Sequence, residues 1–261
     1  MVTSPHGCFP LNPLYKTQIL NVGPSGRICD LSQSNQRSVL ALQGANIETG
    51  ITQDVDSVIA NINPTYVALD YSAAPNLSLP SRWDSAIFDA TSWQGPAGIG
   101  ILAIRNSTAW KNPLPNLGIR RTPESSSLPL LLASAVALEE WLKEEASEAK
   151  RIKDLNDLIR QSLSETNIGI TFAGLVSESV GQTIALVADG CVGEDLVRQL
   201  NEINFVLDSG SACTAAQMQP SHVLAALGMK SEGNLRISLH HGVTEAEVRE
   251  LITAITSVVQ K

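Results

Sequence analysis

Cys213 has the surroundings of a reactive thiol. It lies in the run SGSACTAA, residues 209–216, where Gly210 and its small neighbours give low steric bulk and backbone freedom. The residues from there to Gly228 follow the spacing of an amphipathic helix. A helix N-terminus carries partial positive charge and free N–H groups, which favour the thiolate form of a cysteine. Cys213 is therefore a candidate nucleophile; the alternative is a turn cysteine packed beneath the helix.

Two charged residues stand inside or at the end of apolar runs. Arg236 interrupts LRISL, and a buried guanidinium needs an anionic partner because an uncompensated buried charge is costly. That partner is either a structural carboxylate or the carboxylate of a substrate. Asp70 ends YVALD, and open α/β sheets bind ligands beyond the carboxyl ends of their strands. On its own, Asp70 is better explained as an ordinary turn or capping aspartate.

The composition excludes several classes of protein. The 261 residues include 18 basic and 26 acidic side chains, a net charge of -8, and no basic cluster mixed with aromatics, so nucleic acid is not an expected partner. No apolar run reaches the roughly 20 residues that span a bilayer, and the N-terminus lacks the pattern of a secretory signal. The four cysteines have no metal-ligand spacing, which predicts no metal site and reduced thiols in the cytoplasm.

The first half of the chain alternates short apolar runs with a helical pattern. Continuous apolar runs of this kind are typical of strands buried on both faces of a parallel sheet. A helical pattern with an acidic first turn covers residues 53–63. Strand, helix and strand in this order predict an α/β fold. The predicted strands are 17–22, 37–43, 65–71, 85–90 and 98–105.

The second half begins with a long helical pattern from Leu128 to about Glu165. After it, strands are predicted at 168–174, 182–190, 204–210 and 234–240, and helices at 192–203 and 244–260. Thr244 followed by Glu247 is a capping-box pattern for the last helix. Because the pattern of elements changes after the long helix, we place a domain boundary inside that helix and expect two domains, residues 1–147 and 148–261.

Four motifs together resemble one enzyme family. SGSACTAAQMQPSHVLAALG, NLRISLHHGVTEAEV, QGPAGIG and SSSLP are similar to motifs of cysteine desulfurases of the NifS/IscS type. These belong to the class V aminotransferases, which have the fold type I of pyridoxal-phosphate (PLP) enzymes. The resemblance implies a large domain built on a mostly parallel sheet, here truncated and ending near residue 147. It also implies a smaller α+β domain, residues 148–261, that carries the cysteine loop.

The resemblance assigns roles to five residues. Cys213 matches the cysteine that forms a persulfide, and Arg236 matches the arginine that holds the substrate carboxylate. Asp70 matches the aspartate that pairs with the pyridine nitrogen of PLP. His6 lines up with the histidine that stacks on the PLP ring. Ser127 stands where a threonine reaches the cofactor phosphate of the neighbouring subunit in a dimer.

Other positions depart from the family pattern. In FDATSWQGPAGIG, Ser92 stands where the family has the lysine that forms the Schiff base with PLP. Serine has no amine, so it forms no aldimine. Thr91, Ile47 and Ala73 replace a histidine, an asparagine and a glutamine. The given sequence begins just before His6, whereas the family has its phosphate-binding loop ahead of the matching histidine. We therefore expect no covalent PLP, and at most weak non-covalent binding.

These losses leave open what the protein does. It is expected to be a degenerate desulfurase that acts as a non-catalytic partner or regulatory subunit in sulfur or iron–sulfur metabolism, as a homodimer or as a heterodimer with a complete desulfurase. The first alternative is a persulfide relay through Cys213 to a sulfur acceptor or an iron–sulfur scaffold protein. The second is an active transferase completed in trans. A further hypothesis is that the chain is a decaying or truncated gene product that keeps its fold but has no retained role.

Overall fold

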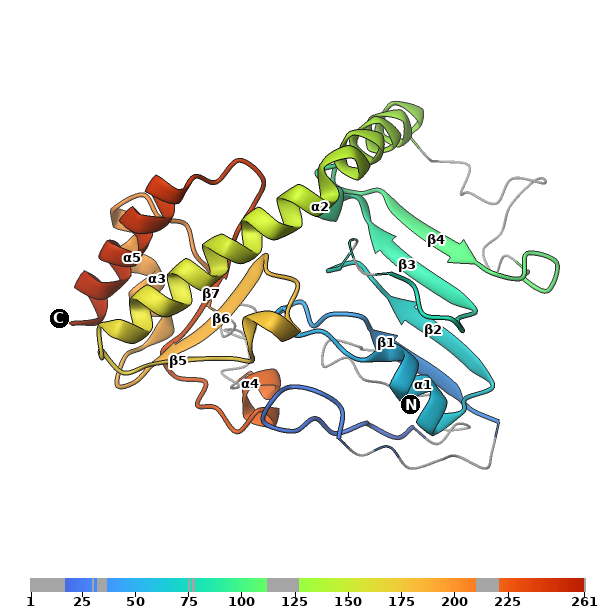
Figure 1. The fold of residues 1–261 in the computed structure, drawn as a ribbon, viewed down its shortest axis with the longest axis horizontal. Coiled ribbons are helices and arrows are strands. Elements are labelled where there is room, and N and C mark those ends of the chain that lie inside the picture. Colours follow the sequence, from blue (N-terminus) through green and yellow to red (C-terminus); the bar gives the residue numbers. More distant parts are fainter. Residues whose placement is uncertain are drawn as a thin grey trace.

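The computed structural model describes residues 17–29, 31, 37–74, 76, 78–111, 127–209 and 221–260. These residues form two sheets that are bridged by one long helix (Figure 1). The chain is thus a mixed α/β protein with a mostly parallel large sheet, as the sequence predicts.

The large sheet has four strands in sequence order. The β1–β2 and β2–β3 pairs are parallel, and β3–β4 is antiparallel. Between β1 and β2, helix α1 (Val55–Ile62) begins at Asp54, whose carboxylate accepts the backbone N–H of Ser57 at 3.1 Å. The strands are β1 (Val39–Gln43), β2 (Tyr66–Asp70), β3 (Ser85–Asp89) and β4 (Gly100–Ile104).

Only one face of the large sheet is packed by a helix of the described chain. On that face Leu42, Leu69 and Ala86 contact the apolar side of α1. On the opposite face Ile87 is 44% exposed and Leu102 is 51% exposed. These two residues are cross-strand partners, so they form one apolar row. Parallel sheets usually have both faces covered, so this row is an unusual feature.

The small sheet is antiparallel, in the order β5 (Ile170–Phe172), β6 (Thr183–Ala188) and β7 (Asn234–Ser238). Helices α3 (Gly193–Glu202) and α5 (Glu245–Val259) and the second half of α2 (Leu128–Glu165) pack on one face of it (Figure 1). Thr244 and Glu247 form the expected capping box of α5. The remaining elements are α4 (His222–Ala226) and two single-turn helices, Ala90–Trp93 and Val176–Glu178.

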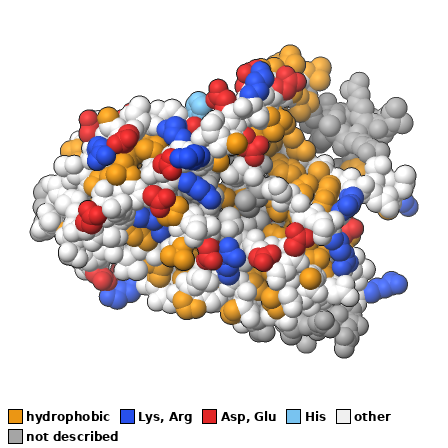
Figure 2. Space-filling view, viewed as in Figure 1, with side chains coloured by type: hydrophobic (Ala, Val, Ile, Leu, Met, Phe, Trp, Pro, Cys, Tyr) orange, Lys and Arg blue, Asp and Glu red, His pale blue; other side chains and the backbone are white. Residues whose placement is uncertain are grey.

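Helix α2 has two different halves. Its second half enters the core of the small sheet from Ile152 onward. Its first half exposes Leu128, Leu132 and Val136, which recur every four residues and form what we call the α2 apolar stripe. Figure 2 shows hydrophobic side chains gathered over this half of α2 and beside the large sheet. Among the described residues, no helix is both long and apolar enough to span a bilayer. The domain division near residue 147 stays a prediction.

Ile51 joins the two sheets. It is 1% exposed, forms a backbone bridge with Ser179, and packs in a cluster with Ala185 of β6 and Leu224 of α4. Gly26 has a φ of +78°, and a Cβ there would lie 2.5 Å from the Ile51 side chain. A glycine at this turn therefore lets residues 17–29 approach the junction.

Most predicted elements are confirmed, and two predicted strands are wrong. Segment 17–22 contributes only isolated bridges, one of them between Val22 and Ile28 across a turn. Segment 204–210 contributes one bridge, between Asp208 and Arg236 of β7. There Asn204 takes a left-handed conformation, with φ of 68°, directly after α3. The chain thus turns and meets the edge of β7 at a single residue instead of extending along it.

Candidate functional site

The carboxylate of Asp70 is used by the turn that follows β2. Asp70 ends that central strand, between Gln43 of β1 and Ile87 of β3, and is half-buried. Its Oδ1 accepts the backbone N–H of Ser72 at 2.9 Å and the hydroxyl of Ser72 at 2.5 Å. Asp70 therefore lies where open α/β sheets bind ligands, while one of its oxygens organises the local turn.

The side chain of Ser92 also forms a local hydrogen bond. It lies in the single-turn helix Ala90–Trp93, which follows β3 directly. Its hydroxyl donates to the carbonyl of Asp89 at 2.6 Å. The Asp89 carboxylate in turn accepts the backbone N–H and the hydroxyl of Thr91, at 2.8 and 2.7 Å. The position that the resemblance assigns to an amine thus carries a hydroxyl engaged in a helical turn.

Trp93 packs toward α2. It is 2% exposed, and its indole N–H donates to the carbonyl of Ser134 at 3.3 Å. A Cβ at Gly95 would lie 2.9 Å from the carbonyl of Ala90 and 3.2 Å from the Trp93 nitrogen, so the turn requires glycine there. The tryptophan fixes the end of β3 against the long helix.

Three further positions from the sequence comparison lie in turns or at a helix end. Ile47 is 48% exposed, in a turn in which Asn46 Oδ1 accepts the backbone N–H groups of Glu48 and Thr49. Ala73 lies in the turn after β2 and is partly buried. Ser127 is the exposed N-cap residue of α2, and its side chain makes no capping hydrogen bond.

Glu48 and Ser221 form a buried polar link that the sequence reasoning missed. Glu48 is 6% exposed and Ser221 is 5% exposed, and the serine hydroxyl donates to the Glu48 carboxylate at 2.5 Å. The same hydroxyl accepts the backbone N–H of Leu224 at 3.2 Å and so caps α4. The link ties the turn after β1 to the start of α4. An acidic residue in the otherwise uncharged run NIETG was the available signal.

Arg236 has a carboxylate partner within the chain. Its Nη2 donates to the side chain of Asp208, and the two residues also form a backbone bridge. Of the two partners that the sequence left open for Arg236, the structural carboxylate is the one observed. Asp208 was missed, although it is the one charged residue in the run NFVLDSG that precedes the cysteine loop.

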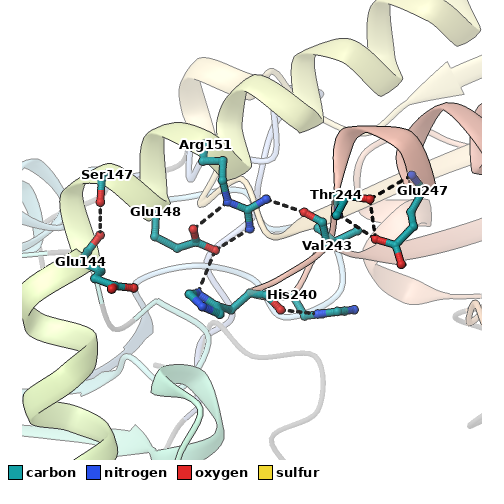
Figure 3. Close-up of polar contacts among 9 residues, drawn as sticks. Glu144, Ser147, Glu148, Arg151, His240, Val243, Thr244 and Glu247 are labelled. Carbon is teal, nitrogen blue, oxygen red and sulfur yellow. Dashed lines mark hydrogen bonds and ion pairs between the residues drawn. The ribbon is translucent and has the colours of Figure 1, made fainter.

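A second polar cluster joins α2 to the segment before α5 (Figure 3). The guanidinium of Arg151 donates from Nε and Nη2 to both oxygens of Glu148, at 2.8 and 2.7 Å, and from Nη1 to the carbonyl of Val243. His241 Nδ1 lies 3.4 Å from Glu148 Oε1. The hydrogen bonds from Arg151 are the main cause that lowers the pKa of Glu148; the nearby charges add to them. These contacts hold α2 against the segment before α5, and we call the cluster of Glu148, Arg151, His241 and Val243 the clasp.

The candidate residues Asp70, Ser92 and Arg236 have separate hydrogen-bond partners. Within the described residues, Asp70 and Ser92 direct their polar atoms to neighbours in their own segments, and Arg236 directs its guanidinium to Asp208, 28 positions away. No group of three His, Cys, Asp or Glu side chains in that part of the chain could hold a metal ion. His6 and Cys213 lie outside the described residues. The roles predicted for all of these side chains stay predictions.

Comparison with known proteins places these features in a family. The model of the class-V aminotransferases, "Aminotransferase class-V", matches residues 118–251, half of the chain. "Cysteine desulfurase 2" of Trichormus variabilis is 24% identical over 95% of this chain and 66% of its own length. "Cysteine desulfurase IscS" of Acinetobacter baumannii is 27% identical over 85% of this chain and 58% of its own length.

Solved structures show the same fold. A "NIFS-LIKE PROTEIN" superposes with a TM-score of 0.80 and 22% identity, over 94% of this chain and 68% of that one. A NifS-like protein from Rickettsia africae gives a TM-score of 0.75 at 17% identity, over 93% of this chain and 69% of that one. The chain spans 58–66% of the length of the curated relatives it matches.

Proposed function

The chain belongs to the class-V aminotransferase family, and from that premise we propose that it is a desulfurase-like subunit without catalytic activity of its own. Its role is to bind a complete cysteine desulfurase in the cytoplasm and so to serve sulfur or iron–sulfur metabolism. The relatives named cysteine desulfurase and the NifS-like fold support the lineage.

The observation that carries the proposal is the geometry at Ser92. The family depends on PLP, and a covalently held PLP needs a lysine amine at this edge of the sheet. The serine hydroxyl donates to Asp89 instead, and the Asp70 carboxylate already accepts two hydrogen bonds from Ser72. The described residues therefore do not fit covalently held PLP, and the proposed role includes no step through it.

The apolar surface supports a binding role. The α2 apolar stripe consists of Leu128, Leu132 and Val136, which are 77%, 68% and 52% exposed. No charged side chain occurs in α2 before Glu139. Exposed contiguous apolar surface on a folded protein is typical of an interaction site. Because the chain carries a net charge of -8, association through an uncharged surface avoids desolvating charges.

The test is association with a complete cysteine desulfurase from the same genome. The two proteins are mixed, the mass of the complex is measured by light scattering, and the sulfide released from L-cysteine is recorded. We expect a heteromeric complex, and no sulfide from this chain alone with added PLP. Leu132→Glu, in the stripe, is expected to abolish the complex. Val206→Glu is the matched control, because Val206 is 84% exposed on the other half of the molecule. Sulfide production by this chain alone would contradict the proposal.

A persulfide relay through Cys213 is a second candidate, favoured by the anchors on both sides of the cysteine segment. Asp208 is held by Arg236 on one side, and Ser221 is held by Glu48 on the other. A relay requires a thiol that accepts sulfane sulfur from a loaded desulfurase. Mass spectrometry without reducing agents would find one added sulfur on Cys213, and Cys191→Ser is the control that keeps it. No transfer to Cys213 would exclude the relay.

Completion in trans is a third candidate, favoured by the exposed row of Ile87 and Leu102 on the large sheet. The same mixing experiment distinguishes it. A complex that releases more sulfide than the complete desulfurase alone, and loses the excess on Cys213→Ser, would support an active transferase. A complex without excess activity supports the non-catalytic role.

A further inference from the structure

Arg236 lies on the face of the small sheet that points toward the large sheet. It pairs across the ladder with Ala185 of β6, and cross-strand partners share a face. Ala185 packs in the cluster with Ile51, which joins the two sheets. The flanking Leu235 and Ile237 face the other way, into the core beneath the helices. The guanidinium therefore belongs to the layer between the sheets.

The guanidinium is ligated from within the chain. Its Nη2 donates to the carboxylate of Asp208, and the side chains of Arg236 and Asp208 are only 29% and 38% exposed. Two backbone hydrogen bonds hold the residues in register, from Arg236 N to Asp208 O at 2.7 Å and from Asp208 N to Arg236 O at 3.3 Å. The backbone bridge does not depend on the Asp208 side chain.

One edge of the guanidinium is only half used. Arg236 Nε is buried and has no hydrogen-bond partner in the described structure. The Nε and Nη2 donors point side by side and match the two oxygens of one carboxylate. Asp208 engages Nη2 alone, whereas a free carboxylate without backbone restraint can satisfy both donors. The unpaired Nε–H makes this site suited to a second kind of carboxylate ligand.

Asp208 is also the one ion-pair partner of Arg236 among the described residues. Removing its charge would leave a half-buried cation without compensation. Such a cation recruits an anion from solution when the geometry allows. Asp208 is thus in direct competition with any external carboxylate for the same guanidinium.

We propose that Asp208 determines what Arg236 binds. Its carboxylate is an internal ligand that occupies Nη2 of the guanidinium and excludes the carboxylate of a free amino acid. The inference goes beyond the proposed function and uses the role that the resemblance implies for Arg236, the position where the α-carboxylate of an amino acid would bind. Asp208 then blocks substrate binding independently of Ser92.

The test follows Arg236 directly by ¹⁵N NMR of the arginine Nε–H signals, assigned with Arg236→Lys. The probes are L-alanine, which has a free carboxylate, and L-alaninamide, which lacks one. We expect the wild-type signal to be unchanged by either probe. In Asp208→Asn the Arg236 signal should shift on addition of L-alanine, with an affinity at least ~10-fold higher than in the wild type. It should not shift on addition of L-alaninamide.

Three variants keep the outcome interpretable. Asp208→Glu retains the carboxylate and should behave like the wild type, and Asp208→Ser provides a second neutral side chain of small size. Asp208→Asn combined with Arg236→Lys has no Arg236 signal, so its binding of L-alanine is compared with that of Asp208→Asn by calorimetry; we expect at least ~10-fold lower affinity, because lysine lacks the planar two-donor edge. Equal binding of L-alanine by the wild type and both neutral variants would overturn the proposal, and so would no binding by folded neutral variants.

The result is separable from the proposed function. Binding of L-alanine needs neither PLP nor a partner protein, so it reports only on Arg236 and Asp208. If the chain forms no complex with a desulfurase but Asp208→Asn gains L-alanine binding, the proposed function fails and this inference stands. If the complex forms and the neutral variants bind nothing, the reverse holds.

Discussion

The two sheets of this chain differ in how completely they are covered. The small sheet is packed by α2, α3 and α5, and Leu200, Ile184 and Ile255 in its core are 0% exposed. The large sheet has the same kind of core on the α1 side, yet its opposite face exposes Ile87 and Leu102. In the described residues, the half with Arg236 therefore has its helix-covered core, whereas the half with Asp70 and Ser92 exposes an apolar row on one face of its sheet.

Apolar residues in the small-sheet core and in the α2 apolar stripe differ in whether they are buried in the isolated chain. Apolar residues in the small-sheet core contribute to folding free energy through burial, at about 25 cal/mol per Å². Apolar residues in the α2 stripe remain in water, so they contribute little to the stability of the isolated chain. Substitutions in the two regions should therefore affect different measurements.

The largest effect is expected in the small-sheet core. Leu200→Ala should lower the free energy of unfolding by about 2–5 kcal/mol, because it loses apolar burial and leaves a cavity. Leu132→Ala, in the stripe, should change it by no more than about 0.5 kcal/mol. Urea unfolding followed by circular dichroism compares the two variants. Similar losses from both would mean that the stripe is buried in solution.

A smaller effect is expected at the link between the sheets. Ser221→Ala removes the cap of α4 and leaves the buried Glu48 carboxylate without its donor. The combined cost should be about 2 kcal/mol in urea unfolding. Ser221→Thr keeps a hydroxyl and serves as the control. If alanine and threonine cost the same, the hydroxyl does not hold the link.

The clasp between α2 and the segment before α5 should contribute about 1 kcal/mol. Hydrogen bonds from Arg151 lower the pKa of Glu148 in the folded state. The stabilisation is therefore complete above the ordinary carboxyl pKa and is lost as the pH falls through the folded value. Urea unfolding of wild type and Glu148→Gln should differ at neutral pH and converge in acid. A difference that is constant with pH would exclude this ionisation.

The smallest effect at neutral pH is expected at Tyr71, which follows β2. Burial, assisted by the charge of Asp56, raises the pKa of Tyr71 to about 12. An unfolded tyrosine ionises near pH 10, so wild-type stability should fall between about pH 10 and 12. Tyr71→Phe should lower the free energy of unfolding by about 0.5 kcal/mol at pH 7. Because phenylalanine does not ionise, the variant should lack the part of the alkaline loss of stability that Tyr71 causes. Stability and phenolate absorbance measured together check it, and identical alkaline curves would contradict it.

Most elements of the fold could be predicted from patterns among residues that are close in sequence. The α2 prediction from Leu128 to about Glu165 matches the observed helix, and the Thr244–Glu247 capping box was readable because cap and partner are three residues apart. Segment 204–210 was mispredicted because apolar composition alone does not reveal how much of a neighbouring edge is available for pairing.

The site was harder to predict because its contacts are distant in sequence. Glu48 and Ser221 are 173 positions apart, and Asp208 and Arg236 are 28 apart. The sequence indicated that Arg236 needs an anion, but only the bridge between segment 204–210 and β7 identifies Asp208. The uncovered face at Ile87 and Leu102 could not be predicted either, because a continuous apolar run is the same whether one face or both are packed.

The proposed function requires that this chain does not hold PLP covalently. The protein is incubated with PLP, reduced with borohydride and digested, and phosphopyridoxyl-lysine is located by peptide mass spectrometry. A complete desulfurase serves as the positive control. We predict no visible aldimine band and only scattered, low labelling of surface lysines. Stoichiometric labelling of one lysine, with an aldimine band that L-cysteine bleaches, would contradict the claim.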